Sequence, residues 1–260
     1  MKVGIIGAGN MGGAIARGLY RAGAGVEITV SNPSQGKLDA IKSECPDIVV
    51  STSNIDAVKG MDVVVFAVKP WLLEGVMTDV APMIEFRRQV LVSVAAGVTL
   101  DTMWEWLRSY SGDRALMRAM PNTAISVGES MTLLCSRNAS DEQVAMVQGL
   151  FDMLGQTALI EERQMAAATA LCSCGIAYAM RYVRAATEGA VELGIYPAQG
   201  RDWLLQTLRG AVALLEATGA NPEVEIDKVT TPGGVTIRGL NAMEANGFTT
   251  AVIEGLKASV

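Results

Sequence analysis

The chain has 260 residues, of which 50% are apolar and 18% are charged, and its formal net charge is −6 at pH 7. This length allows one large domain or two smaller ones with a sizeable core, and the negative charge argues against a nucleic-acid partner, whose phosphates would be repelled. Histidine is absent, which excludes a Ser-His-Asp triad, a Cys-His pair and a His-ligated metal.

The first 160 residues alternate apolar, β-branched runs with helical segments. The runs that predict strands are 3–6, 26–30, 48–50, 63–67, 90–94 and 115–120, and the segments that predict helices between them are 10–22, 35–44, 53–59 and 70–85. This alternation indicates a parallel sheet with right-handed crossovers and helices on both faces. Further on, 128–136 predicts another strand, and 140–154 predicts a helix capped by Ser140 with Gln143 three residues later.

The composition changes after about residue 162, where strand patterns end and alanine becomes frequent. A long helix is predicted over 163–193, ending at Gly194, and a second over 199–217. Asn221-Pro222 marks a break, and a turn at 231–234 leads into a helix that ends at Gly247.

These C-terminal helices carry few charges on any side, so they must be buried. We expect an α/β domain over 1–161 and an all-helical dimerisation domain over 162–260 that packs against a second copy in a two-fold dimer. The alternative is a monomer that buries these helices on its own first domain.

The four cysteines are Cys45, Cys135, Cys172 and Cys174, and they form no CxxC pair. We therefore expect reduced structural thiols and no metal site. The amino terminus is too short and glycine-broken for a signal peptide, and the longest uncharged run, between Arg163 and Arg181, is more typical of a buried packing helix than of a membrane span. These features predict a cytoplasmic protein with no membrane segment.

A glycine-rich loop follows the first predicted strand and opens the first predicted helix. Its sequence is Gly7-Ala8-Gly9-Asn10-Met11-Gly12, the G-x-G-x-x-G pattern of dinucleotide-binding domains in its proper context. Gly7 allows a tight turn, Gly9 lets the backbone approach a pyrophosphate, and Gly12 lets the helix pack close to the strand. The free N–H groups of the helix start bind the phosphates. The loop predicts a Rossmann-type, doubly wound sheet.

The residues after the second strand indicate which nicotinamide cofactor is bound. NAD-selective dehydrogenases usually have an acidic residue there, whereas this chain has Ser31, Asn32, Pro33 and Ser34, with Lys37 beyond. Ser31, Asn32 and Ser34 could donate hydrogen bonds to a 2′-phosphate. We expect NADPH to be preferred, with NADH possible because no arginine is present.

Ligands in open α/β sheets bind outside the carboxyl ends of the strands. The ends of the fourth, fifth and sixth strands should therefore line the cofactor cleft. Asn122, a polar side chain after Pro121, is expected to face that cleft, whereas Lys69 could equally be a surface lysine. The expected cofactor contacts from these segments are Ala67, Val68, Lys69, Pro70, Ala95, Ala96, Gly97 and Asn122.

The stretch Thr230-Thr231-Pro232-Gly233-Gly234-Val235-Thr236, within 227–244, closely resembles the signature of the pyrroline-5-carboxylate reductases. The glycine loop, the segments 68–70 and 120–123, and Gly247-Phe248 match that family in order and spacing, so the resemblance covers essentially the whole chain. It implies a Rossmann domain followed by a helical dimerisation domain. It also implies NAD(P)H-dependent reduction of pyrroline-5-carboxylate to proline, the last step of proline synthesis, in dimers with shared active sites that are often stacked into decamers.

The same stretch has a physical reading of its own. The N–H groups of Gly233, Gly234 and Val235 precede or open a helix and form an anion site that suits a substrate carboxylate, with the hydroxyls of Thr231 and Thr236 nearby. The alternative is an ordinary capped helix start. The resemblance implies that Thr236 bonds the ring nitrogen of the substrate, which makes it the expected catalytic residue.

The resemblance breaks at one place, where Cys172-Ser173-Cys174-Gly175-Ile176 replaces the family's usual Ser-Gly-Ser/Cys-Gly-Pro. We expect Cys172 and Cys174 near the substrate, and the ring size of the imino acid stays open. Two other classes are a β-hydroxyacid dehydrogenase and a non-catalytic nucleotide sensor. The first usually has a lysine on the long interdomain helix, and this chain has none between Arg163 and Gly194.

Overall fold

The structure is a computed structural model that describes residues 1–23, 25–110 and 112–260. It contains two compact units, Met1–Ser173 and Cys174–Val260. The sequence predicts a boundary somewhat earlier, after residue 161. Residues 162–173 belong to the first unit because they pack on its core: Met165 is 2% exposed and lies in one apolar cluster with Leu133 and Cys135.

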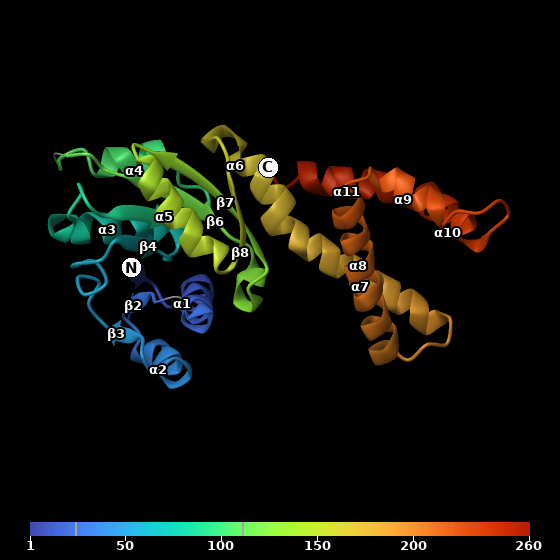
Figure 1. Ribbon diagram of the computed structural model, residues 1–260, viewed down its shortest axis with the longest axis horizontal. Coiled ribbons are helices and arrows are strands. Elements are labelled where there is room, and N and C mark those ends of the chain that lie inside the picture. The colour runs from blue at the N-terminus through green and yellow to red at the C-terminus, as the bar shows by residue number, and fades with distance from the viewer. Residues whose placement is uncertain (24, 111) are drawn as a thin grey trace. The chain divides into compact units, whose positions relative to one another are not determined.

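The first unit is built on an eight-stranded sheet with the order β3-β2-β1-β4-β5-β6-β7-β8 (Figure 1). Its strands are β1 (Lys2–Ile6), β2 (Glu27–Ser31), β3 (Val49–Ser51), β4 (Val63–Phe66), β5 (Val90–Ser93), β6 (Leu116–Met120), β7 (Ser130–Arg137) and β8 (Gly155–Leu159). The strand order reverses between β1 and β4, which is the point where such sheets bind dinucleotides. The predicted doubly wound sheet is confirmed, but it is mixed rather than wholly parallel, since β6 and β7 run antiparallel.

Helices cover both faces of this sheet. They are α1 (Asn10–Ala22), α2 (Gln35–Glu44), α3 (Pro70–Val80), α4 (Leu100–Trp106), α5 (Asp141–Asp152) and α6 (Met165–Thr169), with short 3₁₀ turns η1 (Ala81–Met83), η2 (Thr123–Val127) and η3 (Glu162–Gln164) and a π-helical turn η4 (Ala170–Cys174). Alternate strand residues serve the two faces: Val63 and Val65 pack in a cluster with α1, α2 and α5, and Val64 and Phe66 pack with α3 and α4. This two-sided burial explains the uninterrupted apolar strands.

Local signals fail at the segment 53–59, for which a helix is predicted. The structure has successive turns there, with hydrogen bonds from Asp56, Ala57 and Val58 to carbonyls three residues earlier. The carboxylate of Asp56 accepts a hydrogen bond from the hydroxyl of Ser51 at 2.6 Å, and the amide of Asn54 accepts one from Ser31 at 2.9 Å. These polar side chains bind neighbouring strand ends, which competes with propagation of a helix.

The second unit is helical, as predicted. It contains α7 (Gly175–Glu192), α8 (Pro197–Thr218), α9 (Pro222–Lys228), α10 (Val235–Ala245) and α11 (Phe248–Lys257). The predicted break at Asn221-Pro222 separates α8 from α9. The same two residues also start α9, because Asn221 caps its first turn by accepting from the N–H of Glu223 at 3.0 Å and proline suits the first helical position. Among the described residues of a single chain, Gly200 is the only one that is buried in these five helices.

No helix among the described residues combines the length and the apolar character that a bilayer crossing requires.

Candidate active site

The glycine loop between β1 and α1 has the geometry that each of its glycines predicts. Gly7 has φ +109°, and a Cβ on Gly12 would lie 1.9 Å from the carbonyl oxygen of Gly7. Both positions are therefore closed to side chains by the protein itself. Gly9 differs, because no described atom lies within 4 Å of a Cβ built there. The space at Gly9 is open, which fits a loop that a ligand approaches closely.

Hydrogen bonds to the residues at the end of β2 fix the conformation of this loop. The N–H of Gly7 donates to the carbonyl of Ser31 at 2.8 Å, and the N–H of Ala8 donates to Oδ1 of Asn32 at 3.1 Å. Among the residues that the structure describes, no side chain caps α1, whose N-cap is Gly9 and whose first turn has no acidic residue. The N–H groups at the start of α1, those of Asn10, Met11 and Gly12, are thus left for an anion such as a pyrophosphate.

The end of β2 places the three predicted 2′-phosphate residues in different situations. Ser31 is fully buried and its hydroxyl donates to Asn54, while the amide of Asn32 is used by Ala8 and by the carbonyl of Ser34. Ser34 is exposed at the N-cap of α2 and makes no capping hydrogen bond. The expected phosphate contact therefore falls mainly on Ser34 and the first turn of α2, and the sequence offers no local signal for the role of Asn54.

The ends of β4 and β5 lie at the same edge of the sheet as the glycine loop. A Cβ on Gly7 would lie 2.6 Å from the carbonyl oxygen of Ala67, so the β4 end backs directly onto the loop. Val68 is half-buried, and Lys69 and the loop residues Ala96 and Gly97 are exposed. The ammonium of Lys69 lies 5.9 Å from the ring centre of Trp71. Pro70 opens α3 and Ala95 is buried, so the exposed Lys69, Ala96 and Gly97 are the positions available to a ligand.

The end of β6 meets the turn η4. Asn122 is 9% exposed, and its Nδ2 donates to the carbonyl of Cys172 at 3.2 Å while its Oδ1 accepts from the N–H of Ala124 at 2.9 Å. The hydroxyl of Ser173 donates to the carbonyl of Pro121 at 3.3 Å. Burial raises the pKa of the Cys172 thiol, so this thiol stays protonated at neutral pH.

A partly buried ion pair joins β6 to the turn η3. Arg118 of β6 is 6% exposed, and its Nη1 lies 2.9 Å from Oε1 of Glu162 in η3. The same carboxylate oxygen accepts the N–H of Leu100, which opens α4, at 2.7 Å. Glu162 therefore connects β6 with the segment that follows the Ala95–Gly97 positions.

Cys135 of β7 lies opposite Arg118 in the sheet, and burial raises the pKa of its thiol to about 11, with a further contribution from Glu162. Because the folded chain holds the thiol proton more tightly than the unfolded chain, the raised pKa contributes to stability, and this contribution is complete below pH 9.0. It is lost as the pH rises from 9.0 to about 11, where the thiol ionises first in the unfolded chain. We expect the free energy of unfolding to fall by up to about 2–3 kcal/mol over this interval. Urea unfolding at several alkaline pH values would measure it, and Cys135→Ala should show a shallower decline; equal slopes would contradict the assignment.

In the second unit, the segment 231–234 forms a turn before α10. Gly233 has φ +72° after Pro232, as in a type II turn, and the N–H of Gly234 donates to the carbonyl of Thr231 at 2.9 Å. The N–H of Gly234 is therefore used inside the turn and is not a free donor, contrary to expectation. Gly234 is also the N-cap of α10 and no side chain caps that helix, which leaves the N–H groups of Val235 and Thr236 available.

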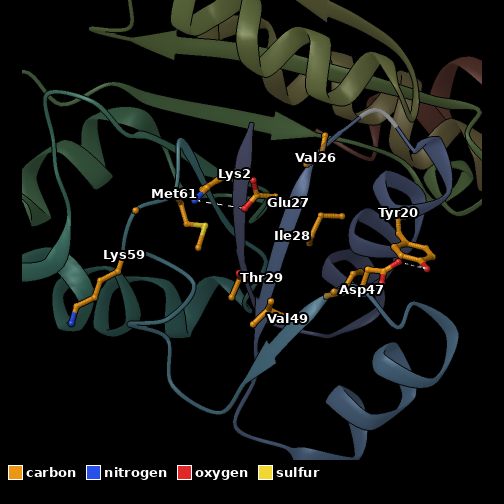
Figure 2. Close-up of a pocket in the computed structure, with 12 residues that line it drawn as sticks. Lys2, Tyr20, Val26, Glu27, Ile28, Thr29, Asp47, Val49, Lys59 and Met61 are labelled. Atoms are coloured by element: carbon orange, nitrogen blue, oxygen red, sulfur yellow. Dashed lines mark hydrogen bonds and ion pairs between the residues drawn. The ribbon is translucent and has the colours of Figure 1, made fainter.

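The predicted residues are thus divided between the two units. The glycine loop, the ends of β2, β4, β5 and β6, and Cys172 belong to Met1–Ser173, and Cys174 and the segment 231–236 belong to Cys174–Val260. A separate cavity of about 390 Å³ lies at the amino ends of β1 and β2, lined by Lys2, Glu27 and Tyr20 among others (Figure 2). It lies at the opposite end of the strands from the glycine loop. It is therefore separate from the carboxyl ends of the strands, where sheets of this kind bind dinucleotides and which we call the cofactor edge.

Comparison with known proteins bears on both units. Residues 162–260 match the family described as "Pyrroline-5-carboxylate reductase dimerisation", and residues 2–97 match "NADP oxidoreductase coenzyme F420-dependent". Pyrroline-5-carboxylate reductase of Arabidopsis thaliana is 34% identical over 262 residues, which cover 99% of this chain and 92% of that protein. The chain belongs to the pyrroline-5-carboxylate reductase family.

Two further members of the pyrroline-5-carboxylate reductase family extend the comparison. Pyrroline-5-carboxylate reductase 1 of Dictyostelium discoideum is 35% identical over 99% of this chain, which spans about half (48%) of that protein's length. The crystal structure of Plasmodium falciparum pyrroline carboxylate reductase with NADP bound superimposes with a TM-score of 0.88 at 26% identity, covering 100% of this chain and 95% of that one. The predicted fold class and the predicted family are therefore confirmed.

Proposed function

We propose that this chain is an NADPH-dependent pyrroline-5-carboxylate reductase that forms proline. The proposal depends on one observation, the presence of two helix starts without a side-chain cap in a chain of this family. One follows the glycine loop, where the space at Gly9 is open, and the other follows the Pro-Gly-Gly turn. The first arrangement suits a dinucleotide, and the second suits a small carboxylate. Two anion sites on one chain favour a two-ligand reaction over a nucleotide sensor.

The residues present fit a bound NADPH. The N–H groups at the start of α1 would hold the pyrophosphate, where the open space at Gly9 lets it approach, and Ser34 with the start of α2 would hold the 2′-phosphate. The positions Ala67 to Pro70 and Ala95 to Gly97 would flank the rest of the cofactor. When bound, NADPH supplies the hydride that reduces the imine carbon.

The substrate side depends on the second unit. The N–H groups of Gly233 and Val235 would orient the carboxylate, and the hydroxyls of Thr231 and Thr236 lie in the same segment. Because the chain has no histidine, we propose that the imine enters as its iminium or takes a proton from water held by Thr236. Cys172 and Cys174 would border the ring. The contribution of the protein is then mainly orientation and exclusion of water.

We also propose that the chain forms a homodimer, and that such dimers can stack into a decamer. We further propose a cytoplasmic location. Support for the dimer comes from large apolar side chains exposed on the second unit, such as Tyr196, Trp203 and Val235, together with the match to a dimerisation family. Support for the location comes from the four cysteines, all of which are free thiols.

The direct test follows the loss of reduced nicotinamide absorbance with pyrroline-5-carboxylate and with a six-membered cyclic imino acid, each with NADPH and NADH. The proposal predicts turnover with the five-membered ring and a higher kcat/KM for NADPH. Tight NADPH binding without turnover of either imino acid would instead support a nucleotide sensor, and a much higher kcat/KM with NADH would overturn the cofactor assignment.

Replacing Thr236 with valine tests the catalytic residue. The change removes one hydroxyl at nearly constant shape, and loss of a hydrogen bond made in the transition state is expected to lower kcat/KM about 100-fold. The Kd of NADPH, measured by fluorescence titration, should stay nearly constant. Thr78→Val in α3 is the matched control, because within the described part of the chain its hydroxyl bonds only carbonyls of its own helix. Wild-type kinetics in Thr236→Val would refute the role.

A further inference from the structure

A π-helical turn interrupts the long helix predicted over 163–193. This turn, η4, covers Ala170–Cys174, between α6 and α7. Turns of this kind are rare and occur frequently at functional sites, because they change which backbone groups are paired inside a helix. The carbonyl of Cys172 in this turn is bound by a side chain from another element, the Nδ2 of Asn122 at 3.2 Å.

The amide of Asn122 is engaged at both ends within the first unit. Its Oδ1 accepts from the N–H of Ala124, its Nδ2 donates to Cys172, and its backbone N–H donates to Oγ of Ser130 at 3.2 Å. Ser130 in turn shares a hydrogen bond with the hydroxyl of Thr132 at 3.0 Å, and both are buried. A buried amide with these partners is held in one orientation.

Ser173 provides a second connection between the same two segments, because its hydroxyl donates to the carbonyl of Pro121. Pro121 and Asn122 follow β6 directly, at the carboxyl edge of the sheet, which is the edge where sheets of this kind bind dinucleotides. The turn η4 is therefore fastened to the end of a strand that borders the cofactor edge, through one side chain from each segment.

We propose that Asn122 is a positioning residue, which fixes η4 against the end of β6 and so sets the place of Cys172 and Ser173 beside the reacting ring without itself contacting the cofactor. The inference rests on the proposed function and deepens it, because it assigns ring-size selection to the hydrogen bond between Asn122 and Cys172. Small displacements of a group beside reacting atoms are costly, since a shift of about 1 Å can reduce a rate about 100-fold.

The variant Asn122→Asp separates the two roles of the amide. An aspartate keeps the side-chain oxygen that accepts from the N–H of Ala124. It replaces the NH₂ group that donates to Cys172 with a second oxygen, which the carbonyl oxygen of Cys172 repels. We expect kcat to fall about tenfold or more and the ratio of kcat/KM for five- and six-membered imino acids to change several-fold, with the Kd of NADPH within about twofold of wild type. Ser173→Ala, which removes the second connection, should change the same ratio to a smaller extent.

Ser140→Ala is the stability control. It removes a helix cap of α5, where Oγ of Ser140 accepts from the N–H of Gln143. A Kd for NADPH raised tenfold or more in Asn122→Asp would show direct cofactor contact and overturn the proposal. The proposal would also be overturned if Asn122→Asp and Ser140→Ala lowered kcat in proportion to their melting temperatures, with no change in the ring-size ratio.

Hydrogen–deuterium exchange distinguishes failure of this inference from failure of the proposed function. If the wild-type chain reduced neither imino acid, the proposed function would fail, and the amides of residues 170–176 would still report on the connection. Faster exchange of these amides in Asn122→Asp, but not in Ser140→Ala, supports the fastening of η4 by Asn122. Unchanged exchange in Asn122→Asp would overturn it.

Discussion

Replacing Glu162 with alanine is expected to lower the free energy of unfolding by about 3 kcal/mol or more, because it leaves a buried guanidinium without a counter-charge. Arg118 is 6% exposed, and its Nε has no hydrogen-bond partner among the described residues. The carboxylate of Glu162 also accepts the N–H of Leu100, so the change removes two interactions at once. Urea unfolding followed by circular dichroism would give the difference from the shift in midpoint.

Two variants make this result specific. Glu44→Ala breaks a different arginine–glutamate pair, in which Arg17 donates two hydrogen bonds to a glutamate whose side chain is 56% exposed. This change should cost at most about 1 kcal/mol. The double variant Arg118→Met with Glu162→Leu removes both charges and should recover much of the lost stability, since apolar residues of similar volume can replace buried ion pairs. Equal losses in Glu162→Ala and Glu44→Ala would show that burial of Arg118 does not matter.

Gly12→Ala is expected to destabilise the chain by about 3 kcal/mol or more, at the upper end of typical overpacking costs. The new Cβ would lie 1.9 Å from the carbonyl oxygen of Gly7 and 2.9 Å from the Cβ of Ala67, so backbone must move to admit it. This movement would separate α1 from β1 and β4 and disturb the cofactor edge. The loss would be measured as a lower midpoint of urea unfolding.

Gly9→Ala is the matched variant, with the same added methyl group three residues earlier. Gly9 has φ −73° and open space around its missing side chain, so the fold should lose no more than about 1 kcal/mol. The methyl group would instead occupy the space proposed for the pyrophosphate and raise the Kd of NADPH about tenfold or more. If Gly9→Ala bound NADPH as the wild type does, the pyrophosphate would not lie on this loop.

Much of the fold is predictable because its signals are local. The six N-terminal strands are short apolar runs, the glycine loop has a fixed pattern, and Ser140 with Gln143 forms the predicted capping box. Two of the elements that escape prediction lack such signals. The strand β8 is a short edge strand that forms beside β7, and Gly247, with φ +79°, both ends α10 and precedes α11. A glycine that stops one helix does not reveal that another follows.

The candidate site is less predictable, because its details depend on partners far apart in the sequence. The residue types at Ser31, Asn32 and Asn122 suggest ligand contacts, yet each side chain is bound by a protein group, Asn54, Ala8 and Cys172 respectively. Glu162 lies 44 positions from Arg118, and no local pattern connects them. Spacing identifies which segments reach the cofactor edge, but only the folded chain shows which polar atoms remain available there.

The near absence of buried residues in α7 to α11 has a consequence for how the two units respond to dilution. The first unit is stabilised by a core formed within one chain. If a second copy covers α7 to α11 as proposed, these helices would be stabilised by association of two chains, which depends on protein concentration. Their stability would then rise with the amount of protein present. At low concentration a chain could keep its nucleotide affinity while losing turnover, so the two properties would decline over different ranges.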